Sequence, residues 1–236
     1  MQIVVSILFV LSAQLCIGQI SPEQYFGDSY YDALNYCKSK KELFYRIGKE
    51  YSVNPTVTSS IVFPELIRYN RFRDFAETAA LEILYIQYGK KTADFSIGRF
   101  QIKPSFVEEL EKLASSDSLL NKQFYKIIQY NTTDTINIRR IRLERLKSES
   151  WQFIYLAAFT KIAQRVYSDY LGESEITDLL LLSSAYNRGL TATFNELSLL
   201  AKKKSFPYGN LSIGRYSYYD VANHYYTNYS HKIFKP

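Results

Sequence analysis

Cysteine and histidine are almost absent from this chain of 236 residues, which has two of each. Cys16 lies in an apolar segment at the N-terminus, and Cys37 is the only other cysteine. We therefore expect no internal disulfide and predict a lone or buried thiol at Cys37. Two histidines and one such cysteine are also too few for a convincing metal site, and we expect neither a metal nor a cofactor.

Long apolar runs are scarce as well. The exception is the first 18 residues, which carry no charge and are almost wholly apolar from Ile3 to Leu11. This run is shorter than the ~20 apolar residues of a membrane span. Together with the small residues that follow, it predicts a secretory signal peptide over 1–18 and one domain over 19–236. We expect an exported bacterial protein, periplasmic or extracellular, with no stable membrane insertion after removal of the signal.

Acidic residues are outnumbered, with 29 Lys and Arg against 23 Asp and Glu, which gives a net charge of +6. A basic surface suits nucleic acid, anionic lipid or an anionic polysaccharide. For an exported chain the polysaccharide is favoured. Nucleic acid is not expected as a partner, because the chain combines a signal-like segment with no recognisable nucleic-acid-binding motif.

Hairpin signals and internal repeats are missing, and the apolar spacing is helical nearly throughout. Asn54 and Pro55 are typical of an N-cap and a first helical position. A mainly α domain follows. Residues 89–98 are predicted to form a loop, and 116–150 two surface helices. Other helices are predicted over 41–51, from Asn54 through Leu66, over 75–88, from Pro104 onward, over 151–170 as an amphipathic helix, over 179–182, over 190–200 and around 218–229.

Three short motifs follow one another in this helical chain. The first is Val62-Phe63-Pro64-Glu65-Leu66, at the end of the helix that Asn54 begins. The second is Gly98-Arg99-Phe100-Gln101, just before Pro104-Ser105. The third is Ala185-Tyr186-Asn187-Arg188-Gly189. In this order they resemble the lytic transglycosylases, the goose-type lysozyme-like family, whose pattern is a helix ending in a catalytic Glu, a Gly-x-x-Gln turn before a Pro-Ser helix start, and an Ala-Tyr-Asn-x-Gly turn.

The resemblance implies a lysozyme-like single domain with a substrate groove. It implies cleavage of the MurNAc–GlcNAc bond of peptidoglycan glycan strands, with Glu65 as the general acid. Tyr186 would orient Glu65, and Asn187 and Gly189 would form the turn that closes that wall. The substrate-binding residues implied in this way are Gly98, Phe100, Gln101, Tyr186 and Asn187.

The chemistry explains why Glu65 needs particular surroundings. Delivering a proton to a glycosidic oxygen requires a carboxylic acid that stays protonated near neutral pH. Apolar surroundings raise the pKa of a carboxyl group because they disfavour its charged form. We expect Val62, Phe63 and Phe100 to supply such a wall around Glu65.

Two alternatives remain open at this point. A transglycosylase needs one acid, whereas an inverting hydrolase needs a second carboxylate to activate water. Asp94, four residues before Gly98, is the best candidate for that second role. Leu66 follows Glu65 where the family usually has Ser, and the charged Arg99 replaces an apolar residue. These departures favour a catalytically inactive glycan-binding or scaffolding protein of the same fold.

Overall fold

The computed structural model describes residues 20–235 apart from 70, 173 and 208–214, and for 71–78 it describes the backbone alone. The predicted signal peptide lies outside this range. Helices make up 74% of the structure, and the described residues contain no strand, only two isolated bridges. The prediction of a mainly α fold is thereby confirmed. None of the described helices is long and apolar enough to cross a membrane.

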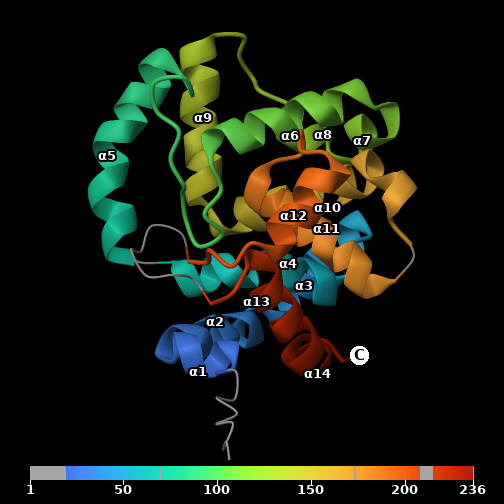
Figure 1. The fold of residues 1–236 in the computed structure, drawn as a ribbon. Helices are drawn as coiled ribbons and strands as arrows, with labels where there is room; N and C mark the ends of the chain where they lie inside the picture. The colour runs from blue at the N-terminus through green and yellow to red at the C-terminus, as the bar shows by residue number, and fades with distance from the viewer. Residues whose placement is uncertain (1–19, 70, 173, 208–214, 236) are drawn as a thin grey trace, which may run out of the picture.

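The helices are numbered along the chain (Figure 1), with a short 3-10 helix at Ser168–Tyr170 and a π turn at Tyr226–Ser230. They are α1 Pro22–Phe26, α2 Asp28–Ser39, α3 Lys41–Tyr51, α4 Pro55–Arg68, α5 Arg71–Tyr88, α6 Pro104–Ser116, α7 Ser118–Gln123, α8 Tyr125–Ile128, α9 Thr135–Lys147, α10 Glu149–Val166, α11 Glu175–Arg188, α12 Phe194–Lys202, α13 Tyr218–Tyr225 and α14 His231–Ile233.

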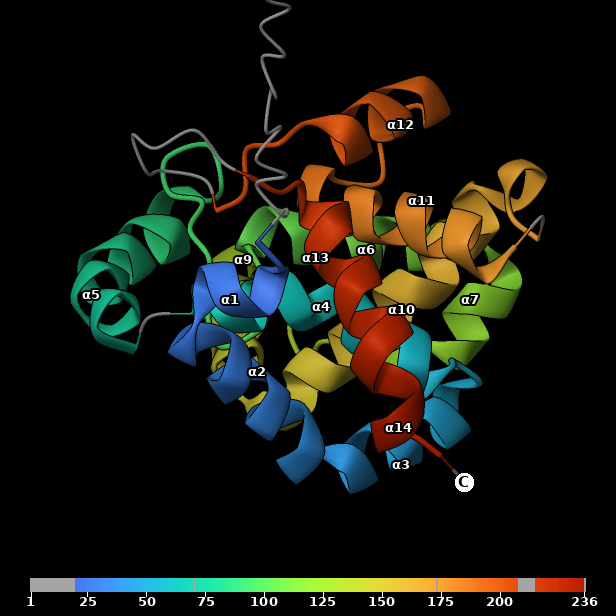
Figure 2. The same cartoon turned by 60° about the horizontal axis from the view of Figure 1, so that its bottom comes forward.

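Helix α4 runs through the middle of the molecule and packs against α2, α3, α10, α11 and α13. Figure 2 shows α1, α2 and α13 in front of it. It begins as predicted, with the Asn54 side chain accepting the N–H of Thr56 and Pro55 in the first helical position. It continues through Pro64, and every residue from Thr58 to Ile67 is buried. A helix buried on all sides carries any polar residue it contains into the interior, and this places Glu65.

Aromatic packing stabilises this core. Phe63 stacks on Tyr225 with ring centroids 3.9 Å apart, and Phe153 contacts both Phe44 and Phe100 edge to face. Pairs of this kind add ~1 kcal/mol each beyond the area that they bury. Cys37 is fully buried among these elements, so the prediction of a buried thiol is confirmed.

Several predicted boundaries are wrong. Helix α2 is not among the predicted helices. The region 116–150 holds α7, α8, α9 and the start of α10, and α9 buries Arg142, Leu143 and Leu146. Helix α10 ends at Val166 and is buried on nearly all sides rather than amphipathic. Helix α12 begins at Phe194, where Thr193 and Glu196 form a capping box.

Candidate active site

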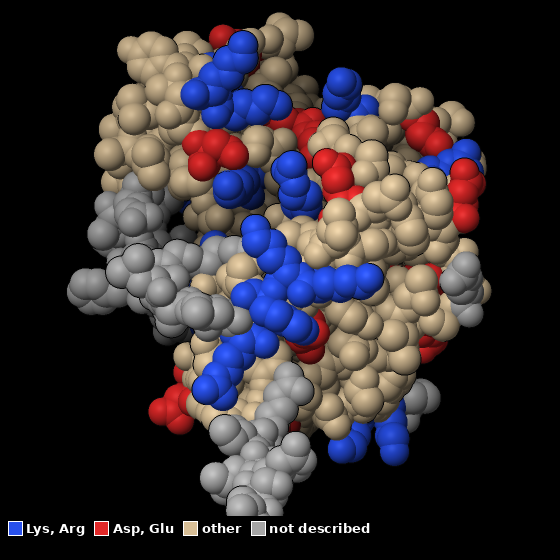
Figure 3. Space-filling view, viewed as in Figure 1, with Lys and Arg blue, Asp and Glu red and all other residues tan. Residues whose placement is uncertain are grey.

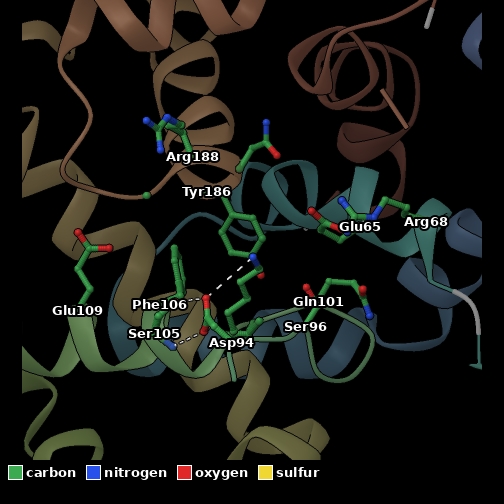
Figure 4. Close-up of a pocket in the computed structure, with 14 residues that line it drawn as sticks. Glu65, Arg68, Asp94, Ser96, Gln101, Ser105, Phe106, Glu109, Tyr186 and Arg188 are labelled. Carbon is green, nitrogen blue, oxygen red and sulfur yellow. Dashed lines mark hydrogen bonds and ion pairs between the residues drawn. The ribbon is translucent and has the colours of Figure 1, made fainter. Parts of the chain in front are cut away.

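A pocket of about 430 Å³ lies beside the C-terminal end of α4. Its other walls are the loop between α5 and α6, the first turns of α6, and the last turn of α11. In Figure 4, Tyr186 lies at the centre, with Glu65 and Arg68 to one side and Glu109 to the other. The pocket therefore brings together segments that are more than a hundred residues apart in the chain.

Glu65 is the most deeply buried charged side chain in this pocket, with 6% of its surface exposed. Its Oε2 atom has no hydrogen-bond partner among the described residues. Burial raises the pKa of Glu65 to about 7, although the positive charges of Arg68 and Lys103 act in the opposite direction. Desolvation outweighs these charges because neither cation bonds the carboxylate closely; the Arg68 Nε atom is 3.7 Å from Oε2, beyond hydrogen-bonding distance. Near neutral pH, Glu65 can therefore hold or release a proton.

The apolar wall predicted around Glu65 is arranged differently, and Val62 is buried without lining the pocket. Phe63 points to the opposite side of α4, against Tyr225 and Tyr30. Phe100 is fully buried behind the pocket rather than in its lining. The aromatic groups that face the pocket are Tyr186 and Phe106, whose rings meet edge to face.

Gly98 shapes the loop that precedes α6 and is not part of the pocket lining. Its φ of +68° lies in the left-handed region, and a β-carbon there would come 1.8 Å from Nε2 of Gln152. The Gln152 side chain accepts the N–H of Phe100 and donates to the carbonyl of Leu146. Glycine is required because the buried amide of α10 occupies the space that a side chain would need.

Gln101 follows in the same loop with an unusual φ of +51°. Its side chain lines the pocket, and its Nε2 donates to the carbonyl oxygen of Gly98 at 2.8 Å. The side chain thus stabilises its own turn. Its Oε1 atom remains as an acceptor for a ligand.

Tyr186 and Asn187 both line the pocket from the last turn of α11, so Asn187 is still helical where a turn was expected. Gly189 ends that helix with a φ of +105°. The Tyr186 hydroxyl donates to the carbonyl oxygen of Phe100 at 2.8 Å, which ties α11 to the loop. Burial and the charge of Glu65 raise the pKa of Tyr186 well above its ordinary value, so the hydroxyl keeps its proton for this bond.

Asp94 lies at the exposed edge of the pocket and already has partners. Its two carboxylate oxygens accept the backbone N–H and the hydroxyl of Ser105, at 3.0 and 2.8 Å. Lys103 Nζ lies 4.0 Å away. These contacts anchor the start of α6 in the manner of a helix cap.

Glu109 is a pocket residue that the sequence did not predict, as are Arg68 and Phe106. Glu109 lies on α6, its Oε1 atom is buried without a hydrogen-bond partner among the described residues, and burial raises its pKa. The backbone N–H of Leu190 and the charges of Lys90 and Lys112 partly oppose this shift. In the sequence, Glu109 sits next to Glu108 in an amphipathic helix, where nothing distinguishes it from a solvated charge.

Charges of both signs surround the pocket. Its lining includes the carboxyl groups of Glu65, Asp94 and Glu109 and three cations, Arg68, Lys103 and Arg188. On the face shown in Figure 3, Lys and Arg gather near the centre with acidic side chains between them. No cluster of His, Cys, Asp and Glu that could hold a metal ion occurs in the described part of the chain.

No family model, curated protein or solved structure matches this chain.

Proposed function

We propose that this protein is a peptidoglycan lytic transglycosylase, exported to the cell wall, with Glu65 as its general acid. The observation that carries the proposal is the buried carboxyl group of Glu65, which lines the pocket. Among the described residues its Oε2 atom has no hydrogen-bond partner, and its pKa is raised to about 7. The three motifs that resemble the family support it, because Glu65, Gln101, Tyr186 and Asn187 line one pocket.

The reaction assigns Glu65 two consecutive proton transfers. The protonated carboxyl group gives its proton to the oxygen that links MurNAc to GlcNAc, and the N-acetyl group of the substrate assists departure of the leaving sugar. The Glu65 carboxylate then accepts the proton of the 6-hydroxyl of MurNAc, the sugar that keeps the assisting N-acetyl group. The oxygen of this hydroxyl attacks C1 of the same MurNAc, displaces the N-acetyl oxygen from it and closes the 1,6-anhydro ring. The first transfer needs the protonated acid, so activity is expected to fall as the pH rises through about 7.

A hydrolase is the second candidate, and one observation favours it. Glu109 gives the pocket a further carboxyl group with a free oxygen, whereas both Asp94 oxygens bond Ser105. If water replaces the 6-hydroxyl as the attacking group, a base must activate it. Glu109 has an oxygen free to accept the proton of that water, whereas both oxygens of Asp94 are occupied by Ser105. Asp94 has the advantage of being exposed, so water reaches it more easily.

The test is digestion of purified peptidoglycan by the full chain and by its Glu65→Gln variant, with products identified by mass spectrometry. Wild-type protein is expected to release anhydro-muropeptides, and the variant to be slower by about a thousandfold, the typical contribution of a general acid. Glu50→Gln, which removes a carboxyl group from the exposed face of α3, is the matched control.

Two other results of the digestion would change the proposal. Reducing-end products from wild-type protein would establish the hydrolase, and the variants Asp94→Asn and Glu109→Gln would then identify the base. If wild-type protein and Glu65→Gln both bind the glycan and neither releases fragments, the catalytic proposal fails in favour of a glycan-binding protein of this fold.

A further inference from the structure

A second pocket, of about 600 Å³, is built partly on the same two segments as the first, the end of α4 and the loop before α6. The end of α4 contributes Leu66, Ile67 and Tyr69 to it, where the first pocket uses Glu65 and Arg68. The loop before α6 contributes Arg99, two residues from the Gln101 of the first pocket. The third wall is helix α2. The second pocket is therefore a separate space built on the same backbone segments.

Arg99 is held in this pocket by aromatic rings rather than by an acidic partner. Its guanidinium carbon lies 4.7 Å from the ring centre of Tyr36 and 4.9 Å from that of Tyr69. The Tyr36 ring is itself fixed by a hydrogen bond from its hydroxyl to Glu149. Stacking on ring faces leaves the N–H groups at the guanidinium edge free to bind a planar anion. Within the described residues, none of the ion pairs closer than 4.0 Å includes Arg99.

Asp32 lies in the same pocket and is equally without an ion pair in the described residues. It is exposed on α2, where Ser29 and Asn35 add neutral hydrogen-bonding groups. The pocket thus offers one guanidinium and one carboxylate to a ligand. This arrangement complements a group that carries both a carboxylate and an ammonium, and Asp32 makes it a poor site for a purely anionic polymer such as a polyphosphate.

We propose that this pocket binds the peptide branch of the substrate, with a peptide carboxylate on Arg99 and an amine on Asp32. The inference rests on the proposed function, because it takes peptidoglycan, a glycan with peptide branches, as the polymer. A strand whose sugars occupy the first pocket passes the shared end of α4. Its branch can then reach the second pocket, and branched strands become better substrates than bare ones.

The test compares two substrates: glycan strands with their peptide branches, and the same strands stripped by an amidase. The full chain is expected to show a kcat/KM about tenfold higher on the branched strands, the effect of one hydrogen-bonded charge pair. Arg99→Gln is expected to bring this ratio close to one. Arg99→Lys, which keeps the charge and loses the planar fork, is expected to fall between them. Lys38→Gln removes an exposed charge from α2 outside the pocket and is the matched control.

A binding measurement separates this proposal from the proposed function. Calorimetric titration with a free branch peptide that holds a diamino acid is expected to show binding by wild-type protein, weakened about tenfold or more in Arg99→Gln. Amidation of the peptide carboxylates, or acetylation of its amine, is expected to weaken binding in the same way. If both strand types are cleaved equally and Arg99→Gln changes neither the ratio nor peptide binding, the second-pocket proposal is overturned and the glycan-cleaving function stands. If neither strand type is cleaved, the proposed function fails and peptide binding alone decides the role of Arg99.

Discussion

Glu65 and Glu111 are both buried carboxyl groups on helices, and their partners differ. On α6, Glu111 accepts two hydrogen bonds from Arg142, at 3.1 and 2.6 Å, and a third from the hydroxyl of Tyr130. Arg142 also bonds Tyr85 and Glu108. On α4, Glu65 has only a loose contact with Arg68. Burial with full pairing makes a structural ion pair, whereas burial without pairing favours the neutral acid.

The largest predicted effect is on the paired carboxyl group. Glu111→Gln leaves Arg142 buried with only part of its partners, which is expected to lower the free energy of unfolding by about 3 to 5 kcal/mol. Urea denaturation at pH 7 measures this loss. Glu144→Gln, at the exposed pair with Lys147, is the control and is expected to change stability by less than about 0.5 kcal/mol. A Glu111→Gln loss as small as that of the control would remove the distinction between the two buried carboxyl groups.

Glu65→Gln is expected to raise the free energy of unfolding at alkaline pH, whereas Glu111→Gln lowers it. The ordinary pKa of Glu65 is 4.5 and the folded value is about 7, so between these values the unfolded chain releases a proton that the folded chain keeps. Stability therefore falls as the pH rises through this window and levels off above it, a cost of ~3 kcal/mol. Glutamine does not ionise, so the variant is expected to exceed wild-type stability by ~3 kcal/mol at pH 8 and to match it near pH 4. Thermal unfolding across pH measures the difference; a constant difference at every pH would contradict the raised pKa.

Arg68→Gln gives the smallest effect of the three. The charge of Arg68 lowers the pKa of Glu65, so its removal is expected to extend the alkaline limit of the proposed glycan cleavage by up to about one pH unit. The pH dependence of kcat, compared with that of wild-type protein, tests this. A shift toward lower pH would mean that Arg68 does not act on Glu65 through its charge.

The same contrast explains what the sequence could predict. Helix α4 and its start at Asn54 and Pro55 follow from local capping rules and apolar content. The grouping of Glu65, Gln101, Tyr186 and Asn187 in one pocket agrees with expectation, because the motifs that hold them carry their own turn residues. Gly98 and Phe100, predicted to bind substrate, are not among the residues that line the pocket.

Two features that the sequence did not predict, the buried side of α9 and the place of Glu109 in the pocket, depend on contacts between distant segments. The charged sequence of α9 is typical of a solvated helix. In the structure, however, Arg142 pairs with Glu111, 31 residues earlier in the chain. In the sequence Glu109 resembles its exposed neighbours. In the fold the end of α11 lies beside it, with Gly189 close to its Oε2 atom. No local pattern encodes such pairings, since each partner alone looks like a surface charge.

The contact between Gly98 and Gln152 restricts how this sequence can evolve. Any larger residue at 98 meets the Gln152 amide. Any shorter residue at 152 leaves the N–H of Phe100 and the carbonyl of Leu146 without their partners. Neither position can change first without a loss of stability, so the two are epistatic. If the proposed glycan cleavage were lost from a lineage, Glu65 would be expected to change long before Gly98.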